Sequence, residues 1–243
     1  MFLPLHDSAP LRVIRFQFVT GVIIMLNVAV FLISHYAIPP TEVKQIPLSF
    51  GAIPAVITDR AELAAALHVI PEKATLFTYM FLHGGWMHLI GNMLFMWVFA
   101  DNVEDGFGHL GFIVFYFVCG LAAVAAHIAL SPGSQAPIIG ASGAVAGVLG
   151  AYILLFPRSR VLFLLFMRIP LRLAAVWVLA AWLGFQLFMI YSGGGTAGHV
   201  ALWAHVGGFA AGFLITLVLR GRILRRLGRT RIVSLEDERG QEA

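Results

Sequence analysis

The sequence is poor in charged residues and almost free of cysteine. Of its 243 residues, 12% are charged and 60% are hydrophobic, whereas soluble domains carry about 25% charged and about 45–50% apolar residues. Water therefore cannot be the main solvent of this chain. The single cysteine, Cys119, excludes an intramolecular disulfide and a cysteine-cluster metal site.

The long apolar stretches also lack the alternation of a β-strand, and several approach the roughly 20 residues with which an α-helix crosses about 30 Å of hydrocarbon. Backbone in lipid must satisfy its own hydrogen bonds. We therefore predict an all-α polytopic membrane protein, a bundle of six transmembrane helices. The six predicted spans are residues 16–38, 86–103, 110–130, 141–156, 171–191 and 200–219.

Basic residues are distributed unevenly between the predicted loops. If the N-terminus is cytosolic, only Lys44, Arg60 and Lys73 of the 16 Lys and Arg residues fall outside the cytosol. This positive-inside bias predicts that both termini are cytosolic. The predicted parts are a cytosolic segment 1–15, a six-helix domain 16–219 with an outer loop 39–85, and a basic cytosolic tail 220–243.

We expect the tail to contact anionic membrane lipids and not nucleic acid, because its arginines lie where the topology already requires them. The outer loop either packs partly into the outer leaflet or is an ordinary extracellular loop. The first apolar stretch is too long for a signal-peptide core, and the preceding residues lack a transit-peptide pattern. A bacterial plasma membrane is the expected location, with an organelle as the alternative.

The fourth predicted span is too short to cross the hydrocarbon, since about 16 helical residues extend only about 24 Å. Its N-terminus, at Gly140, Ser142 and Gly143, should therefore begin below the outer surface, buried in protein. A helix N-terminus presents free N–H groups and positive dipole charge, which suit a developing oxyanion. Ser142 is thus a candidate nucleophile, although it could also simply cap the helix or lie in a tight interface.

The sixth predicted span carries His205 at about the same depth as Ser142. Gly208 and Gly212 follow on one face and permit close approach of another helix. His205 is therefore the candidate general base. The alternatives are an interhelical hydrogen bond by His205, or a competing base at His199.

Three further polar residues precede or begin the second span. His88 and Asn92 are spaced i, i+4 and share one helix face, where both can donate hydrogen bonds to a common target. His83 should point elsewhere, and we expect it to anchor the outer loop.

No carboxylate is available near this candidate site. The nearest acids, Asp101, Glu104 and Asp105, fall at the opposite end of the second span. The chemistry would have to be a Ser-His dyad, with no cofactor and no metal ion. A rival hypothesis is a transporter that uses intramembrane histidines as ligands, although the sequence has no His-Glu-x-x-His motif. Those histidines are His83, His88, His199 and His205.

In order, spacing and placement, three motifs resemble those of the rhomboid family of intramembrane serine proteases. The motifs are His83-x4-His88-x3-Asn92, Gly140-Ala141-Ser142-Gly143 and Ala204-His205-Val206-Gly207-Gly208. The resemblance implies a six-helix core, a dyad opening to an outer aqueous cavity, and cleavage in or near transmembrane segments of protein substrates. It implies that Ser142 is the nucleophile, that His205 is the base, and that His88, Asn92 and the Ser142 N–H form the oxyanion hole.

Two features depart from the family pattern. Some members carry an aromatic residue four positions after the serine, where this chain has Ala146, so other groups must orient His205. The outer loop also lacks the Trp-Arg pair of many relatives. The nearest alternative is a catalytically inactive relative that binds membrane clients. The retention of Ser142 and His205 argues against this alternative.

Overall fold

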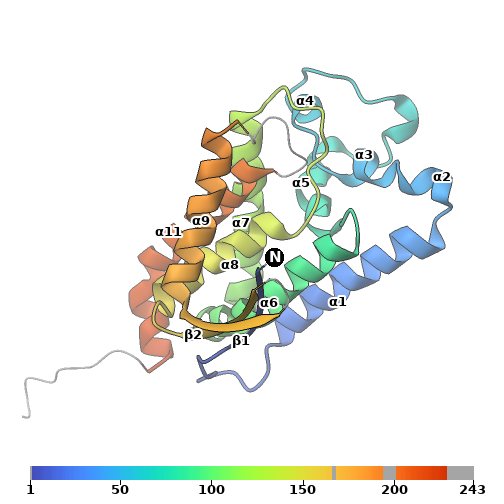
Figure 1. Ribbon diagram of the computed structural model, residues 1–243. Coiled ribbons are helices and arrows are strands. Elements are labelled where there is room, and N and C mark those ends of the chain that lie inside the picture. The colour runs from blue at the N-terminus through green and yellow to red at the C-terminus, as the bar shows by residue number, and fades with distance from the viewer. Residues whose placement is uncertain (1, 166–167, 194–200, 229–243) are drawn as a thin grey trace, which may run out of the picture.

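The chain folds into a helical bundle capped at one end by a small β-sheet (Figure 1). A computed structural model describes residues 2–165, 168–193 and 201–228. His199 and the tail beyond residue 228 lie outside these residues. The long helices of the described part are α1 (Phe18–Leu32), α6 (Trp86–Phe107), α7 (His109–Leu130), α8 (Ser142–Leu155), α9 (Ala175–Tyr191) and α11 (Leu202–Arg226).

Among the described residues, three helical segments are long and apolar enough to cross a membrane. They are Phe18–Ala37, which joins α1 to the π-helical turn η1 (Ile33–Ala37), then α7 and α11. α8 and α9 are shorter apolar helices. The chain is thus mostly helical, as expected, and the count of six spans stays a prediction.

The outer loop is not an extended connection but a series of short helices. Its elements are α2 (Pro40–Val43), α3 (Ile46–Phe50), α4 (Pro54–Ile57), η2 (Ala65–Leu67), η3 (Glu72–Ala74), α5 (Thr75–Thr78) and η4 (Tyr79–Phe81). The backbones of Ala52 and Ile138 exchange hydrogen bonds of 3.1 and 2.8 Å. This contact ties the loop to the segment that leads into α8.

The prediction of an all-α fold is wrong at the opposite end of the bundle. Strands β1 (Phe2–Asp7), β2 (Arg160–Leu165) and β3 (Ile169–Ala174) form an antiparallel sheet in the order β1-β2-β3. The fifth long helix consequently begins at Ala175, and residues 171–174 of the predicted span belong to β3. A short apolar run does not by itself distinguish strand from helix, and Pro170 has no amide hydrogen for a helix interior.

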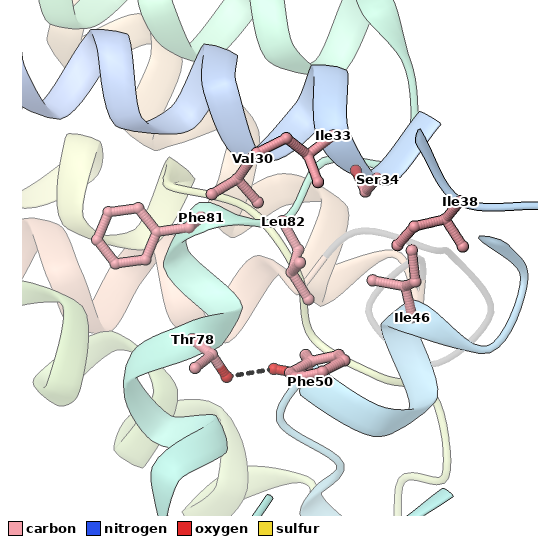
Figure 2. Close-up of a pocket in the computed structure, with 9 residues that line it drawn as sticks. All are labelled: Val30, Ile33, Ser34, Ile38, Ile46, Phe50, Thr78, Phe81 and Leu82. Atoms are coloured by element: carbon pink, nitrogen blue, oxygen red, sulfur yellow. Dashed lines mark hydrogen bonds between the residues drawn. The ribbon is translucent and has the colours of Figure 1, made fainter. Parts of the chain in front are cut away.

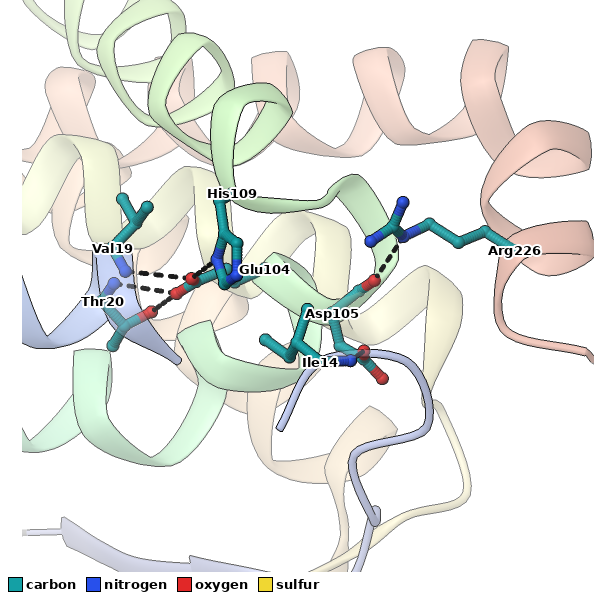
Figure 3. A network of polar contacts seen from close by, with 7 residues as sticks. All are labelled: Ile14, Val19, Thr20, Glu104, Asp105, His109 and Arg226. Carbon is teal, nitrogen blue, oxygen red and sulfur yellow. Dashed lines mark hydrogen bonds and ion pairs between the residues drawn. The ribbon is translucent and has the colours of Figure 1, made fainter. Parts of the chain in front are cut away.

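The N-terminal segment is fastened to the end of α6 by two buried acidic side chains (Figure 3). Glu104 accepts hydrogen bonds from the backbone N–H groups of Val19 and Thr20, at 3.0 and 2.8 Å. It therefore caps the start of α1 in the way that an anion stabilises a helix N-terminus. The Glu104 carboxylate also lies 2.5 Å from Nδ1 of His109.

Asp105 makes the second attachment. Its carboxylate accepts the backbone N–H groups of Arg12, Val13 and Ile14 at 2.7, 2.9 and 2.8 Å. Its backbone carbonyl accepts Nε of Arg226 at 3.0 Å, which brings the end of α11 to the same place. Residues 12–20 are therefore an integral part of the fold.

Asp7 connects the sheet to the helices. Its carboxylate is buried and accepts hydrogen bonds from the Tyr152 hydroxyl and, at 3.2 Å, from the Asn102 amide. Burial raises the pKa of Asp7 above its ordinary value, and the hydrogen bond from Tyr152 opposes only part of that rise. β1 is thus anchored by a carboxylate whose ionisation the fold disfavours.

Candidate functional site

The site is built around the N-terminus of α8. This helix has 14 residues and extends about 21 Å, well short of the roughly 30 Å of a hydrocarbon core. Gly140, just before it, has a φ of +115°, a backbone conformation that favours glycine. Its N–H donates to the Tyr79 carbonyl at 2.8 Å, so the loop before Ser142 is held against η4.

α8 and α11 approach each other through glycines. A Cβ atom built on Gly208 would lie 2.0 Å from the carbonyl oxygen of Gly143, and one on Gly212 would lie 2.0 Å from that of Gly147. A Cβ on Gly143 would meet Ala123 of α7 at 2.6 Å. Only glycine permits backbones this close, so these positions fix how far α8 stands from α11.

This close packing brings Ser142 and His205 into contact. Nε2 of His205 lies 2.8 Å from Oγ of Ser142, within hydrogen-bond distance. The two residues are 63 positions apart in the sequence and come from different helices. A serine hydroxyl beside an imidazole nitrogen is the geometry of an activated nucleophile and its base.

His205 has a second partner, which none of the three sequence motifs contains. Its Nδ1 lies 3.0 Å from Oε1 of Gln186, a buried side chain of α9. An amide oxygen can only accept a hydrogen bond, so Nδ1 carries the proton and Nε2 presents its lone pair to Ser142. The indole of Trp182 also flanks His205, with ring centroids 5.8 Å apart. Gln186 and Trp182 are the groups that orient the imidazole beside the small, buried Ala146.

A signal for Gln186 was present in the sequence. It is the only amide or charged side chain between Ala175 and Tyr191, and a polar side chain in hydrocarbon is costly unless it is paired. Its partner could not be inferred, because that depends on the rotation of α9 against α11.

His88 and Asn92 line the same cavity as Ser142 and His205. The cavity has a volume of about 220 Å³, and its walls are Met87, His88, Gly91, Asn92, Phe95, Ser142, Val145, Ala146, Leu149, Trp182 and His205. A Cβ placed on Gly140 would lie 2.6 Å from Nε2 of His88 and 3.6 Å from Nδ2 of Asn92. Both α6 side chains therefore lie directly against the backbone that precedes Ser142.

The donors of these two residues are available. Nδ1 of His88 lies 3.5 Å from the Gly84 nitrogen, a long hydrogen bond that favours the ring hydrogen on Nε2, the atom nearer Gly140. Nδ2 of Asn92 is buried, and no described residue accepts a hydrogen bond from it. An unpaired donor at a helix N-terminus is suited to an oxyanion.

His83 lies behind this group. It is buried, and its ring packs edge-on against that of His88 with centroids 5.0 Å apart. It does not line the cavity wall given above. The His83 ring therefore packs against His88 and helps to hold its position.

The acidic side chains of α6 are far from this site. Glu104 follows His88 by 16 residues, or about 24 Å of helix, and both Glu104 and Asp105 hold the N-terminal segment. In the described part of the chain, the hydrogen-bond partners of the His205 imidazole are Ser142 and Gln186, neither of which is a carboxylate. No group of three or more His, Cys, Asp or Glu residues that could hold a metal ion occurs among the described residues.

Comparison with known proteins connects this geometry to a family. The family model described as the Rhomboid domain matches residues 71–222, which include Ser142, His205, His88 and Asn92. Rhomboid protease GluP of Bacillus subtilis is 30% identical over 59% of this chain and 25% of its own length.

Two eukaryotic proteins are similar to a comparable extent. RHOMBOID-like protein 5 of Arabidopsis thaliana is 28% identical over 61% of this chain and 44% of its own. Rhomboid protein 1, mitochondrial, of Saccharomyces cerevisiae is 28% identical over 60% of this chain and 41% of its own. The matched region thus spans less than half of the length of each of these relatives. Because the domain match itself covers more than half of this chain, the protein belongs to the rhomboid family.

Proposed function

We propose that this family member is an intramembrane serine endopeptidase that cleaves peptide bonds in or near the transmembrane segments of other membrane proteins. Ser142 is the nucleophile and His205 the general base. The observation that carries the proposal is the 2.8 Å contact between Oγ of Ser142 and Nε2 of His205, with Nδ1 of His205 held by Gln186. The similar protein of Bacillus subtilis is named a rhomboid protease, which supports the same activity.

The first half of the reaction forms an acyl-enzyme. Oγ of Ser142 attacks the carbonyl carbon of the scissile bond while its proton passes to Nε2 of His205. The carbonyl oxygen becomes an oxyanion, for which the N–H of Ser142, Nε2–H of His88 and Nδ2–H of Asn92 are the nearby donors. The protonated His205 then gives its proton to the leaving amine nitrogen as the C–N bond breaks.

The second half restores the enzyme. A water molecule gives a proton to Nε2 of His205 and attacks the acyl carbon, and the ester bond to Oγ breaks. The oxygen of Ser142 recovers a proton from His205, and the new carboxylic acid leaves. Gln186 is a positioning residue in both halves, since it keeps the proton on Nδ1 of His205 and touches no reacting atom.

The proposal includes a placement in the membrane. Six spans with cytosolic termini would open the cavity at Ser142 to the extracytoplasmic side of a membrane, which we take to be the bacterial plasma membrane. The sheet and the C-terminal end of α11 lie at the same end of the bundle (Figure 1), which supports termini on one side. The proposed partners are transmembrane protein substrates and membrane lipids, with no role for nucleic acid.

A fluorophosphonate probe tests the proposal on the purified full chain. The probe should form an adduct on Ser142 of the wild type, located by peptide mass spectrometry. Ser142→Ala should not be labelled, His205→Ala should be labelled far more slowly, and the control Ser192→Ala, altered at the exposed end of α9, should match the wild type. An adduct on another residue, or an unlabelled wild type with an intact fold, would refute the proposed nucleophile.

A further inference from the structure

A second cavity lies away from the dyad, between the end of α1 and the outer-loop helices (Figure 2). It measures about 320 Å³, which falls at the lower end of the range for small-molecule pockets, about 300–1,000 Å³. Its walls come from α1, η1, α3 and the segment around η4. The lining residues are Val30, Ile33, Ser34, Ile38, Ile46, Phe50, Thr78, Phe81 and Leu82.

The two hydroxyl groups in this wall are already used. Oγ1 of Thr78 donates to the Phe50 carbonyl at 2.6 Å, and Oγ of Ser34 donates to the Phe31 carbonyl at 3.0 Å. A buried water molecule requires about two to four polar partners, which this surface does not supply. The chemistry of the lining therefore selects an apolar occupant.

The cavity is a recess in a surface that exposes large apolar side chains. Ile33 lines it and is also 59% exposed, and Tyr36, on the same π-helical turn, is 70% exposed. Trp86, which packs edge-on against Phe31 at 4.9 Å, is half exposed. Exposed Tyr and Trp side chains are enriched where the hydrocarbon meets the headgroups. The recess thus lies at the edge of one leaflet, within reach of acyl chains.

Two charged residues lie close in sequence to the lining residues Ile38 and Ile46. Glu42 and Lys44 are exposed in the short stretch between η1 and α3, and Lys44 precedes the lining residue Ile46 by two positions. Among the described residues, Lys44 has no ion-pair partner. A lysine ammonium binds phosphate as a point charge, and Glu42 could face a headgroup amine.

From these observations we propose that the recess binds one acyl chain of a membrane glycerophospholipid, whose phosphate lies near Lys44. The chain fills the space between Val30 and Ile46, and the headgroup stays at the exposed rim. The inference requires an integral membrane protein and does not depend on the proposed proteolysis.

A lipid bound in the recess would contact residues 78–82, the segment that holds the loop before Ser142. Thr78, Phe81 and Leu82 line the recess, and the intervening Tyr79 accepts the N–H of Gly140 at 2.8 Å. The Tyr79 hydroxyl in turn donates to the Gly120 carbonyl at 2.8 Å. A lipid chain against Phe81 and Leu82 therefore supports the backbone that holds Gly140, two residues before Ser142.

Photo-crosslinking in vesicles tests the binding itself. The full chain is reconstituted with phosphatidylethanolamine that carries a diazirine on one acyl chain, and the adducts are located by peptide mass spectrometry. The adducts should concentrate in the stretches 30–38, 46–50 and 78–82. Even labelling of all exposed apolar surfaces, or adducts absent from these three stretches, would overturn the proposal.

A pair of matched variants sharpens the result. Val30→Phe fills the recess and should lower labelling there about tenfold, equivalent to about 1.4 kcal/mol of binding. Val114→Phe makes the same change on the exposed face of α7 and should leave the recess labelling unchanged. Ile46→Phe fills the recess from the opposite wall and serves if Val30→Phe does not fold. Undiminished labelling in the folded filling variants would refute the site.

The headgroup is tested separately by Lys44→Gln. This variant should weaken recess labelling by the phospholipid and leave labelling by a diazirine-bearing diacylglycerol, which has no phosphate, unchanged. Equal labelling of wild type and variant by the phospholipid would remove Lys44 from the site. Because all of these readouts are adducts, they are independent of whether Ser142 cleaves substrates.

Discussion

Nδ1 of His205 on α11 lies 3.0 Å from the amide oxygen of Gln186 on α9, opposite the contact of Nε2 with Ser142. An uncharged amide thus occupies the place that a carboxylate holds in a Ser-His-Asp triad. Like that carboxylate, the amide oxygen keeps the proton on Nδ1 of His205, but it adds no negative charge to the interior of the bundle.

Gln186→Leu should lower kcat because Nδ1 of His205 loses its acceptor and the productive tautomer is no longer fixed. We expect a loss between about tenfold and about 10³-fold, below the roughly 10⁴-fold seen when a triad aspartate becomes an amide. Gln186→Glu restores an acceptor and should recover most of the turnover. Its carboxylate favours the imidazolium, so the acid limb of the pH–rate profile should move to higher pH. Turnover of Gln186→Leu at the wild-type rate would show that Gln186 only packs.

Ser142→Ala and His205→Ala should each abolish cleavage of a model transmembrane substrate while the melting temperature stays close to that of the wild type. A dyad has no spare nucleophile and no spare base. The measurement is substrate turnover in vesicles. Persistent proteolysis by either folded variant would exclude the dyad.

Asn92→Ala and His88→Ala should be slow but active, since each removes one oxyanion donor and leaves the N–H of Ser142. A single donor is worth about 10²–10³ in kcat in a dry site, and a cavity open to water would reduce the loss. Turnover at saturating substrate is compared with the melting temperature, with Ile90→Ala on the exposed face of α6 as control. Unchanged turnover in both variants would return these residues to a structural role.

Gly208→Ala should destabilise the protein and slow catalysis together, because its Cβ would lie 2.0 Å from the carbonyl oxygen of Gly143. Overpacking of this kind costs about 1–3 kcal/mol, and moving α11 away from α8 separates His205 from Ser142. Gly221→Ala, on the same helix with nothing within 4 Å, is the matched control and should be neutral or stabilising. Equal thermal stability of the two variants would contradict the close helix contact.

Asp7→Asn tests the buried carboxylate at the sheet. Because burial raises the folded-state pKa of Asp7, the wild type should lose stability as pH rises from the ordinary aspartate value, about 3.9, through that raised pKa. Asn cannot ionise and retains an acceptor for Tyr152, so the variant should lack this loss and gain stability relative to the wild type toward neutral pH. Thermal unfolding across this pH range measures the difference, and parallel curves would show that Asp7 is not responsible.

The sequence by itself predicted the helices that depend on local composition. Helix α6, the second predicted span, starts at Trp86, and helix α7, the third predicted span, ends at Leu130, as predicted. Hydropathy and helix-breaking residues act over a few neighbouring positions, so they can be read along the chain. The matched depths of Ser142 and His205, which follow from helix length, likewise predicted that these two residues meet. The resemblance of the three motifs to the rhomboid family added His88 and Asn92 to the candidate site.

Tertiary structure alone decided the β-sheet, the anchoring of the N-terminal segment and the partner of His205. β1 pairs with β2 across more than 150 positions, and Asp105 binds backbone N–H groups more than 90 positions away. Gln186 meets His205 because of how α9 is rotated against α11. Each of these contacts joins segments that are separated in the sequence, and no local sequence pattern indicates which residues will pair. Only the folded arrangement of the chain determines them.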